Sequence, residues 1–415
     1  MRSGTSFSQG LRHSVDDNRA GGPAWTVEAV RQVRYHVVSS DHLFALDNTA
    51  LLDGCPDAPL RAGDRRLVVI DENVDKLYGG RIRDYFAYHR IAVTMVALRA
   101  DEPVKEWESV LRVVDAMNDF GIDRRREPVL AIGGGVLTDI VGFAASLYRR
   151  GTPYIRIPTT LIGLVDAGVG VKTGVNYGLG KNRLGTYAPA TATFLDRTFL
   201  RSLAPRHISN GLAEIMKMAL IRSEELFALL ESWGAAVHAD RLQGSTGELA
   251  AASDAIVAEA IHLMLEELQP NLWESHLERC VDYGHTFSPT VEMHALPELL
   301  HGEAVMIDMA LTTALATLRG DLCEADADRI HRVAGALGLP VWNDVLEDPA
   351  LLEAALLDTV RHRDGHQRLP LPVGIGRHHF VNDVTPAELR AATDLLRRKA
   401  AIAGHTPAGY ARVSA

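Results

Sequence analysis

The hydrophobic positions in the first half of the chain form short runs, separated by stretches with helical spacing. Runs of apolar residues that predict strands occupy 67–70, 91–98, 128–132 and 154–157. Between the second and third runs, residues 107–120 place their apolar side chains on one side of a helix. Strands that alternate with helices predict a parallel sheet covered by helices, with ligands bound at the carboxyl ends of the strands.

The pattern changes near residue 202, beyond which helical spacing dominates. Helices are predicted over 210–231, 249–269 and 303–318, and a capping box at 385–388 predicts the start of a last helix. We therefore expect a flexible leader over 1–34, an α/β domain over 35–204 and a mostly helical domain over 205–415. The cleft between the two domains is the expected active site.

Composition excludes several functional classes. The 415 residues are 47% hydrophobic and 23% charged, with a formal net charge of −10. That charge, and the absence of a long basic run, argue against nucleic acid as a partner. No apolar segment is long enough for a membrane span and no signal peptide is apparent, so no membrane partner is expected. The three cysteines, Cys55, Cys280 and Cys323, are typical of reduced thiols in the cytoplasm.

Three consecutive glycines, Gly133 to Gly135, follow the strand predicted over 128–132. The pattern predicts a strand, a tight turn and a helix that begins near Asp139. Glycines let backbone amides approach a pyrophosphate, and the amino end of a helix adds partial positive charge. The spacing differs from the usual G-x-G-x-x-G, so an ordinary turn between strand and helix remains the alternative.

Two short motifs supply residue types that bind metal ions. Glu214 and Lys217 lie three positions apart, and therefore on one face of a helix whose flanking residues are apolar. His285 and His301 each lie beside a glycine, which leaves room for a ligand. Two histidines and one glutamate make a common zinc site with an open position for substrate. A surface ion pair and two hydrogen-bonded structural histidines are the alternatives.

A glycine-rich segment over 159–182 carries a third group of polar residues. They are Thr159, Thr160, Asp166, Lys172, Lys181 and Asn182. The glycines of this segment predict an irregular loop rather than a helix. Lysines in such a loop suit a phosphate or a polyol substrate, and two solvated lysines on a flexible loop are the alternative.

Together these motifs resemble the sugar phosphate cyclase family, whose best-known member is 3-dehydroquinate synthase. The resemblance runs from about residue 35 to the end of the chain, with the motifs in family order. They are Asp71-Glu72-Asn73, Glu102-Pro103-Val104-Lys105, the three glycines, Pro158-Thr159-Thr160, Lys172-Thr173-Gly174, Glu214 with Lys217, Gly284-His285 and His301-Gly302-Glu303. The resemblance implies the dehydroquinate synthase-like fold, with an α/β dinucleotide-binding domain and a mostly helical domain for metal and substrate.

The resemblance also implies two cofactors, with residues for each. NAD would lie against the glycine turn and contact Asp71, Asn73, Glu102, Lys105, Gly134, Gly135, Val136, Asp139, Thr159, Thr160 and Lys181. One divalent metal, zinc or cobalt, would be held by Glu214, His285 and His301. The substrate would be bound by Arg150, Asp166, Lys172, Lys181, Asn182, Lys217, Asp282 and His362. Family members form homodimers, in which Arg150 would reach the phosphate in the neighbouring subunit's site.

Departures from the dehydroquinate synthase pattern indicate which substrate the chain uses. That enzyme carries a second histidine where this chain has Pro289, and an asparagine where it has Asp282. The arginine that grips the substrate carboxylate falls at Glu278 or Arg279, and a lysine pair is replaced by residues 360–362. An acid at Asp282 and the loss of cations would repel a carboxylate, so we expect a neutral, polyhydroxylated substrate end.

These departures resemble the sedoheptulose 7-phosphate cyclases, and residues 285–289 resemble the members that form 2-epi-5-epi-valiolone, a cyclitol of antibiotic biosynthesis. Pro289 cannot exchange protons, so Asp282, His362 or a water would replace the missing histidine. The alternatives are a cyclase that forms 2-epi-valiolone or a gadusol precursor, then 3-dehydroquinate synthase, then a metal-dependent polyol dehydrogenase.

The chemistry implied by the resemblance is a cyclisation with loss of phosphate. NAD would oxidise the C5 hydroxyl transiently, phosphate would leave by elimination, the hydride would return, and an aldol addition would close the ring. Catalysis would depend on Asp166, Lys172, Lys217 and Asp282. Lys172 and Lys217 would stabilise the developing alkoxide or enolate.

Overall fold

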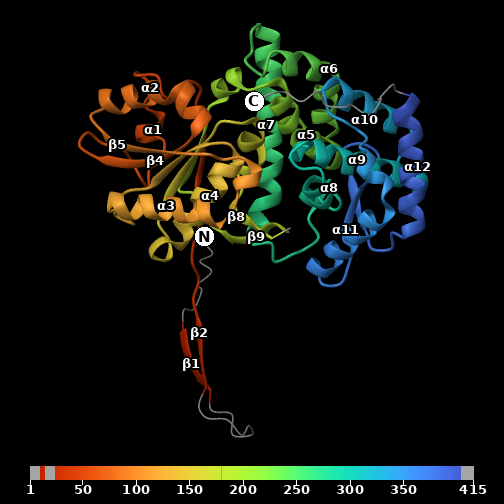
Figure 1. The fold of residues 1–415 in the computed structure, drawn as a ribbon, viewed down its shortest axis with the longest axis horizontal. Coiled ribbons are helices and arrows are strands. Elements are labelled where there is room, and N and C mark those ends of the chain that lie inside the picture. The colour runs from red at the N-terminus through yellow and green to blue at the C-terminus, as the bar shows by residue number, and fades with distance from the viewer. Residues whose placement is uncertain (1–9, 15–23, 179, 403–415) are drawn as a thin grey trace, which may run out of the picture. The chain divides into compact units, whose positions relative to one another are not determined.

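The computed structural model describes residues 10–14, 24–178 and 180–402 (Figure 1). The chain divides into two units, residues 1–35 and residues 36–415. In the first unit, β1 (Gly10–Ser14) and β2 (Ala24–Glu28) pair antiparallel. The sequence predicts only a flexible leader here, although the aromatic and β-branched residues of β2 favour a strand. The remainder of the predicted leader up to β2 lies outside the described residues.

A six-stranded parallel sheet forms the centre of the α/β part, as the sequence predicts. Its strand order is β3-β10-β7-β6-β4-β5, and all neighbouring pairs are parallel. The strands are β3 (His36–Ser39), β4 (Arg65–Asp71), β5 (Ala92–Leu98), β6 (Val129–Gly133), β7 (Tyr154–Pro158) and β10 (Ala192–Leu195). The sequence predicts β4 to β7 correctly. It misses β3 and β10, whose four residues each are too few to establish a pattern.

Helices cover both faces of this sheet (Figure 1). On one face, α1 (Ala50–Asp53) and α2 (Glu72–Tyr88) share an apolar core with the strands. On the other face, α3 (Trp107–Phe120) and α4 (Gly135–Leu147) form a second core. Helix α3 has the predicted bounds. With both faces covered, the carboxyl edge of the sheet is the region left for a ligand.

The glycine-rich segment after β7 is not the irregular loop that the sequence predicts. Residues Gly163–Ala167 form a π-helical turn (η3), and β8 (Lys172–Tyr177) and β9 (Gly180–Tyr187) form an antiparallel hairpin. Gly174 and Gly185 lie opposite each other, and a Cβ on either would lie within 2.6 Å of a facing carbonyl oxygen. These glycines therefore permit close strand pairing instead of preventing it.

Helices dominate the rest of the chain. They are α5 (Pro205–Arg222), α6 (Glu224–Ala239), α7 (Gly247–Leu268), α8 (Ser288–His294), α9 (His301–Arg319), α10 (Glu324–Ala336), α11 (Pro349–His362) and α12 (Pro386–Ile402), with a hairpin of β11 (Leu369–Pro372) and β12 (His378–Val381). Short 3-10 segments are η1 (Glu102–Val104), η2 (Tyr148–Arg150), η4 (Arg197–Ser202), η5 (Gln269–Asn271), η6 (Cys280–Asp282) and η7 (Asp344–Glu347). The predicted capping box of α12 is confirmed: the amide of Glu388 donates to Thr385 Oγ1, and the amide of Thr385 donates to the Glu388 carboxylate.

The single helix predicted over 210–231 is in fact two helices. The break falls at Ser223, which is extended and whose Oγ accepts a hydrogen bond from the amide of Leu226 at 3.1 Å. Helices α5 and α9 pack together in the core of the helical part and are buried along most of their lengths. The division near residue 204 stays a prediction, because residues 36–415 form one unit. Among the helices described, none is long and apolar enough to cross a membrane.

Candidate active site and metal centre

The glycine turn lies at the end of β6, but the helix after it begins earlier than predicted. Helix α4 begins at Gly135, with Gly134 as its N-cap, rather than near Asp139, because the turn needs only one residue. A Cβ on Gly134 would lie 3.1 Å from the Thr160 side chain, and one on Gly135 would lie 3.3 Å from Ala167. The amino end of α4 is therefore a cradle that larger side chains would fill, with backbone amides suited to a phosphate.

Polar groups at the neighbouring strand ends border this turn. At the end of β4, Asp71 accepts hydrogen bonds from the amides of Asn73 at 2.8 Å and Val74 at 3.2 Å. Burial raises the pKa of the Asp71 carboxyl, although these hydrogen bonds oppose the shift. After β7, the amide of Thr159 donates to the carbonyl of Gly133 at 3.0 Å. Three adjacent strands thus bring residues from three predicted motifs to one edge of the sheet.

Lys105 connects α4 to the hairpin. Its buried Nζ lies 2.7 Å from Asp139 Oδ2 and 2.7 Å from Asn182 Oδ1. Burial would lower the pKa of Lys105, but Asp139 and Glu102 raise it overall. Glu102 in turn accepts a hydrogen bond from Asn176 at 2.9 Å. Residues that the resemblance assigns to NAD and to the substrate therefore share one network.

Glu214, His285 and His301 come together although they lie far apart in the sequence. One ligand atom from each lies within 4.8 Å of the others. Glu214 Oε1 is 3.7 Å from His285 Nε2 and 3.4 Å from His301 Nε2. Glu214 is 1% exposed, and within the described ranges its Oε1 has no hydrogen-bond donor. A buried carboxylate oxygen that faces two imidazole nitrogens without a donor is the arrangement that a divalent metal completes.

Both histidine rings are oriented by their other nitrogen. His285 Nδ1 lies 3.0 Å from the carbonyl of Tyr283, and His301 Nδ1 lies 2.8 Å from Glu292 Oε2. Such partners fix the ring orientation of metal-binding histidines. Burial lowers the pKa of His285 to about 4. For His301, burial and Lys181 lower the pKa, but Glu292 and Glu214 outweigh them and raise it to about 9.

Glu292 is a site residue that the sequence interpretation missed. It is 2% exposed and lies 2.5 Å from Lys181 Nζ in addition to its contact with His301. Burial opposes ionisation, yet His301 and Lys181 lower the pKa of Glu292 to about 2. Helix α8 is only seven residues long, so its sequence could not show which side of it faces the site.

Lys217 is not the surface residue of the alternative interpretation. It is 2% exposed, and its Nζ lies 2.7 Å from Glu214 Oε2 and 3.5 Å from Asp166 Oδ2. Burial would lower the pKa of Lys217, but Asp166 and Glu214 raise it well above its usual range. Burial raises the pKa of Asp166, although Lys217 opposes this shift. Lys217 is therefore a fixed cation beside the metal-ligand group, which consists of the candidate ligands Glu214, His285 and His301.

Asp282 is not the free, repelling carboxylate that the sequence predicts. It contacts Arg279, and its Oδ2 lies 3.2 Å from Arg363 Nη2. Burial opposes ionisation, but these two arginines lower the pKa of Asp282 to about 2. Glu274 contacts both Lys172 and Arg279. The expectation that cations are lost here is wrong, because Arg279, three positions before Asp282, and Arg363, far along the chain, both pair with the acid.

At two places, one of two neighbouring residues faces the acidic residues and the other is exposed. Arg279 faces the acidic residues, whereas Glu278 is exposed. Arg363 reaches Asp282, whereas its neighbour His362 lies beside Arg183 at 2.6 Å and is 57% exposed. The role predicted for His362 in substrate binding therefore has no support from its contacts, and Arg363 is the second residue that the sequence missed.

Two further predicted residues, Lys181 and Arg150, lie in different environments. Lys181 pairs with Glu292 and lies 3.2 Å from His301 Nδ1, on the metal side of the hairpin. Arg150 is exposed and has a left-handed backbone with φ of 64°. A positive φ is uncommon for a residue with a side chain and marks a special turn. Among the residues that the structure describes, no hydrogen bond or ion pair joins Arg150 to Glu214, His285 or His301.

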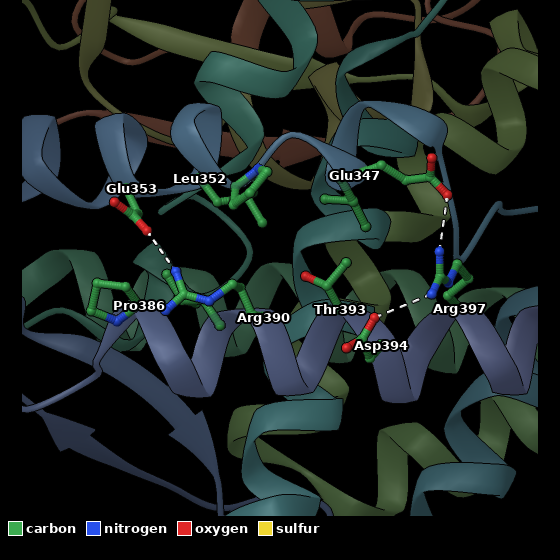
Figure 2. Close-up of a pocket in the computed structure, with 11 residues that line it drawn as sticks. Glu347, Leu352, Glu353, Pro386, Arg390, Thr393, Asp394 and Arg397 are labelled. Carbon is green, nitrogen blue, oxygen red and sulfur yellow. Dashed lines mark hydrogen bonds and ion pairs between the residues drawn. The ribbon is translucent and has the colours of Figure 1, made fainter.

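A hollow of about 280 Å³ between α11 and α12 lies outside this site (Figure 2). Ion pairs cross it, with Arg390 3.1 Å from Glu353 and Arg397 3.6 Å from Glu347. Leu352 is among the residues that line it, and none of the predicted site residues does. The hollow is therefore not the predicted active site.

Comparison with known proteins places these residues in a family. Residues 95–210 match the model described as 3-dehydroquinate synthase N-terminal, and residues 211–360 match 3-dehydroquinate synthase C-terminal. The chain is similar to 2-epi-5-epi-valiolone synthase of Streptomyces albus, with 59% identity over 89% of this chain and 90% of the relative. A relative of the same name from Actinoplanes is 58% identical over 91% and 94% of the two chains. A solved structure also matches, that of ValA (2-epi-5-epi-valiolone synthase) from Streptomyces hygroscopicus subsp. jinggangensis 5008 with NAD+ and Zn2+ bound. The match has a TM-score of 0.85 and 53% identity, and it covers 90% of this chain and 100% of that one.

Proposed function

This chain belongs to the 3-dehydroquinate synthase family, and we propose that it cyclises sedoheptulose 7-phosphate to 2-epi-5-epi-valiolone with loss of phosphate. The observation that carries the proposal is the metal-ligand group of Glu214, His285 and His301, set beside the buried Lys217. A polyol dehydrogenase could hold the same three residues, so the similarity of the chain to named cyclases supports this reaction over a net polyol dehydrogenation.

The residues present fit both cofactors. Glu214, His285 and His301 would hold zinc or cobalt, which supplies Lewis acidity toward a substrate hydroxyl when bound. The cradle at Gly134 and Gly135 would hold the phosphates of NAD, which when bound accepts a hydride from the substrate and returns it.

The two lysines would serve different purposes. Lys217, whose pKa is raised by Asp166 and Glu214 against the effect of burial, stays cationic and stabilises negative charge on a substrate oxygen. Although the Lys172 side chain is 59% exposed, desolvation by the surrounding protein, and then Arg279, lower its pKa to about 8, so its Nζ can exchange a proton near neutral pH. In the elimination the bond from C7 to the phosphate oxygen breaks, and the C6 proton passes to a phosphate oxygen. Asn182 and Arg150 would contact the phosphate.

The ion pairs around Asp282 support a substrate whose end there is neutral. Lys172 and Arg279 contact Glu274, and Arg279 and Arg363 contact Asp282, so each cation of this cluster already has an anionic partner. Both arginines are already paired with Asp282, and neither is free for a substrate carboxylate. A sugar phosphate with a neutral, hydroxylated end fits this balance better than a carboxylated one.

We also propose a homodimer in the cytoplasm. Trp107 and Leu111 on α3 and Leu147 on α4 are exposed apolar residues, and Leu147 directly precedes the turn that carries Arg150. A second copy covering these residues would bring Arg150 to a partner's site. The three cysteines are free, as expected in a reducing compartment.

Phosphate release tests the proposal. The protein is loaded with zinc or cobalt and NAD, then offered sedoheptulose 7-phosphate and the carboxylated precursor of dehydroquinate in parallel. We expect phosphate from the first substrate only. Release from the carboxylated precursor instead would contradict the interpretation of Asp282.

A further inference from the structure

Arg156 is a buried cation that the proposed reaction does not use. It lies in the middle of β7, is 0% exposed, and alternates with Ile155 and Ile157 of the apolar core. Within the described ranges its hydrogen bonds go to carbonyl oxygens, and no carboxylate forms an ion pair with it. A charge buried in this way is costly, so it needs a function that an apolar residue could not supply.

The guanidinium of Arg156 binds three backbone carbonyls of one segment, at distances of 2.5–3.1 Å. They belong to Ala167, Gly170 and Lys172. Thr193, which is opposite Arg156 on the neighbouring strand β10, donates its Oγ1 to the carbonyl of Gly168 at 2.8 Å. Two adjacent side chains of the sheet therefore hold four carbonyls of residues 167–172.

This segment lies between two residues of the candidate site. Asp166 immediately precedes it and lies 3.5 Å from Lys217, and Lys172 ends it and contacts Glu274. Glycines at 168 and 170 leave its backbone intrinsically free to adopt many conformations. The four hydrogen bonds from the sheet restrict that freedom.

We propose that Arg156 and Thr193 are positioning residues that fix segment 167–172 and thereby place Asp166 and Lys172 against the substrate. The identity of that substrate rests on the proposed function, whereas the positioning itself does not. A planar guanidinium presents five donors in a rigid fork and can hold three carbonyls at once. A lysine ammonium at the same position keeps the charge but cannot reproduce the fork.

The test compares Arg156→Lys and Thr193→Val with the wild type, and Thr193→Ser serves as the control that keeps the hydroxyl. Hydrogen–deuterium exchange on the full chain measures the amides of segment 167–172. In both test variants we expect exchange in this segment to be at least about tenfold faster, with the strands β4 and β6 unchanged. We also expect kcat/KM for sedoheptulose 7-phosphate to fall at least about tenfold, with zinc and NAD binding unchanged. Thr193→Ser should match the wild type.

Unchanged exchange in segment 167–172 of Arg156→Lys and Thr193→Val would overturn the proposal. Faster exchange throughout the sheet, or a parallel loss of zinc and NAD binding, would also overturn it, because either result means general destabilisation. If Arg156→Lys does not fold, Thr193→Val carries the test, and failure of both to fold assigns the pair to stability alone. A wild-type protein that releases no phosphate from sedoheptulose 7-phosphate would refute the proposed function, while the exchange data would still decide the positioning role.

Discussion

Replacing Glu292 with glutamine tests how the candidate site holds a metal ion. Glu292 Oε2 lies 2.8 Å from His301 Nδ1, and Oε1 lies 2.5 Å from Lys181 Nζ. Glutamine keeps the shape of the side chain but removes its charge. His301 then loses the anionic partner that orients its Nε2 toward Glu214, while the three proposed ligands stay in place.

The size of the effect follows from the burial of these groups. Losing such a partner of a ligating histidine lowers metal affinity about 10- to 100-fold, or about 1.4–2.8 kcal/mol. In the Lys181–Glu292 pair the side chains are 12% and 2% exposed, so the lysine also loses a buried counter-ion. Breaking a buried pair costs about 3–5 kcal/mol of unfolding free energy, and we expect less here because the amide oxygen still accepts a hydrogen bond.

Competition with a chromophoric chelator measures the zinc affinity of the Glu292→Gln variant. Glu303→Gln is the matched control. Like Glu292, Glu303 is buried and paired with a cation, in its case Arg206 at 2.6 Å, but it lies on α9. No contact joins the Glu303 side chain to the ring of His301 in the described part of the chain. We expect Glu303→Gln to bind zinc like the wild type. Wild-type zinc affinity in Glu292→Gln would refute the reasoning.

Three further substitutions test other parts of the site. Glu214→Ala should lose bound zinc and turnover together, and a variant that retains both on metal analysis would rule Glu214 out as a ligand. Asp282→Asn should free Arg363 and leave Arg279 paired with Glu274 alone, so the carboxylated precursor of dehydroquinate should inhibit at least about tenfold more strongly; equal inhibition constants would contradict the charge argument. Because desolvation by the surrounding protein and then Arg279 lower the pKa of Lys172 to about 8, its cation is lost as the pH rises through that value, and kcat/KM should fall there. Lys172→Arg should abolish this alkaline limb of the pH profile, and a limb that persists would assign the titration to another group.

Local sequence patterns predict much of the fold, and they fail where tertiary contacts decide. The apolar runs of β4 to β7 are long enough to identify the parallel sheet, and α3 has the predicted bounds. The β8–β9 hairpin was not predictable, because Gly174 and Gly185 suit close strand pairing as well as a loop. The break between α5 and α6 depends on one residue, Ser223, within an otherwise continuous helical pattern.

The candidate site divides in the same way. Motif order identifies the family, and the three residues proposed as metal ligands do converge. Glu292 and Arg363 were missed because their importance lies in the side chains they meet, His301 and Asp282, which neighbouring residues cannot reveal. The predicted repulsion by Asp282 was wrong in part for the same reason, because one of the two arginines that balance its charge, Arg363, is brought close only by the fold.

By the proposed function, this chain oxidises, eliminates, reduces and cyclises within one site. The most direct measurement uses sedoheptulose 7-phosphate deuterated at C5, with NAD and zinc, followed by NMR of the product and absorbance of reduced cofactor. We expect 2-epi-5-epi-valiolone that retains the deuterium, one phosphate released per product, and no accumulation of reduced cofactor. Reduced, deuterated cofactor formed in step with substrate loss would contradict it and show a net dehydrogenase.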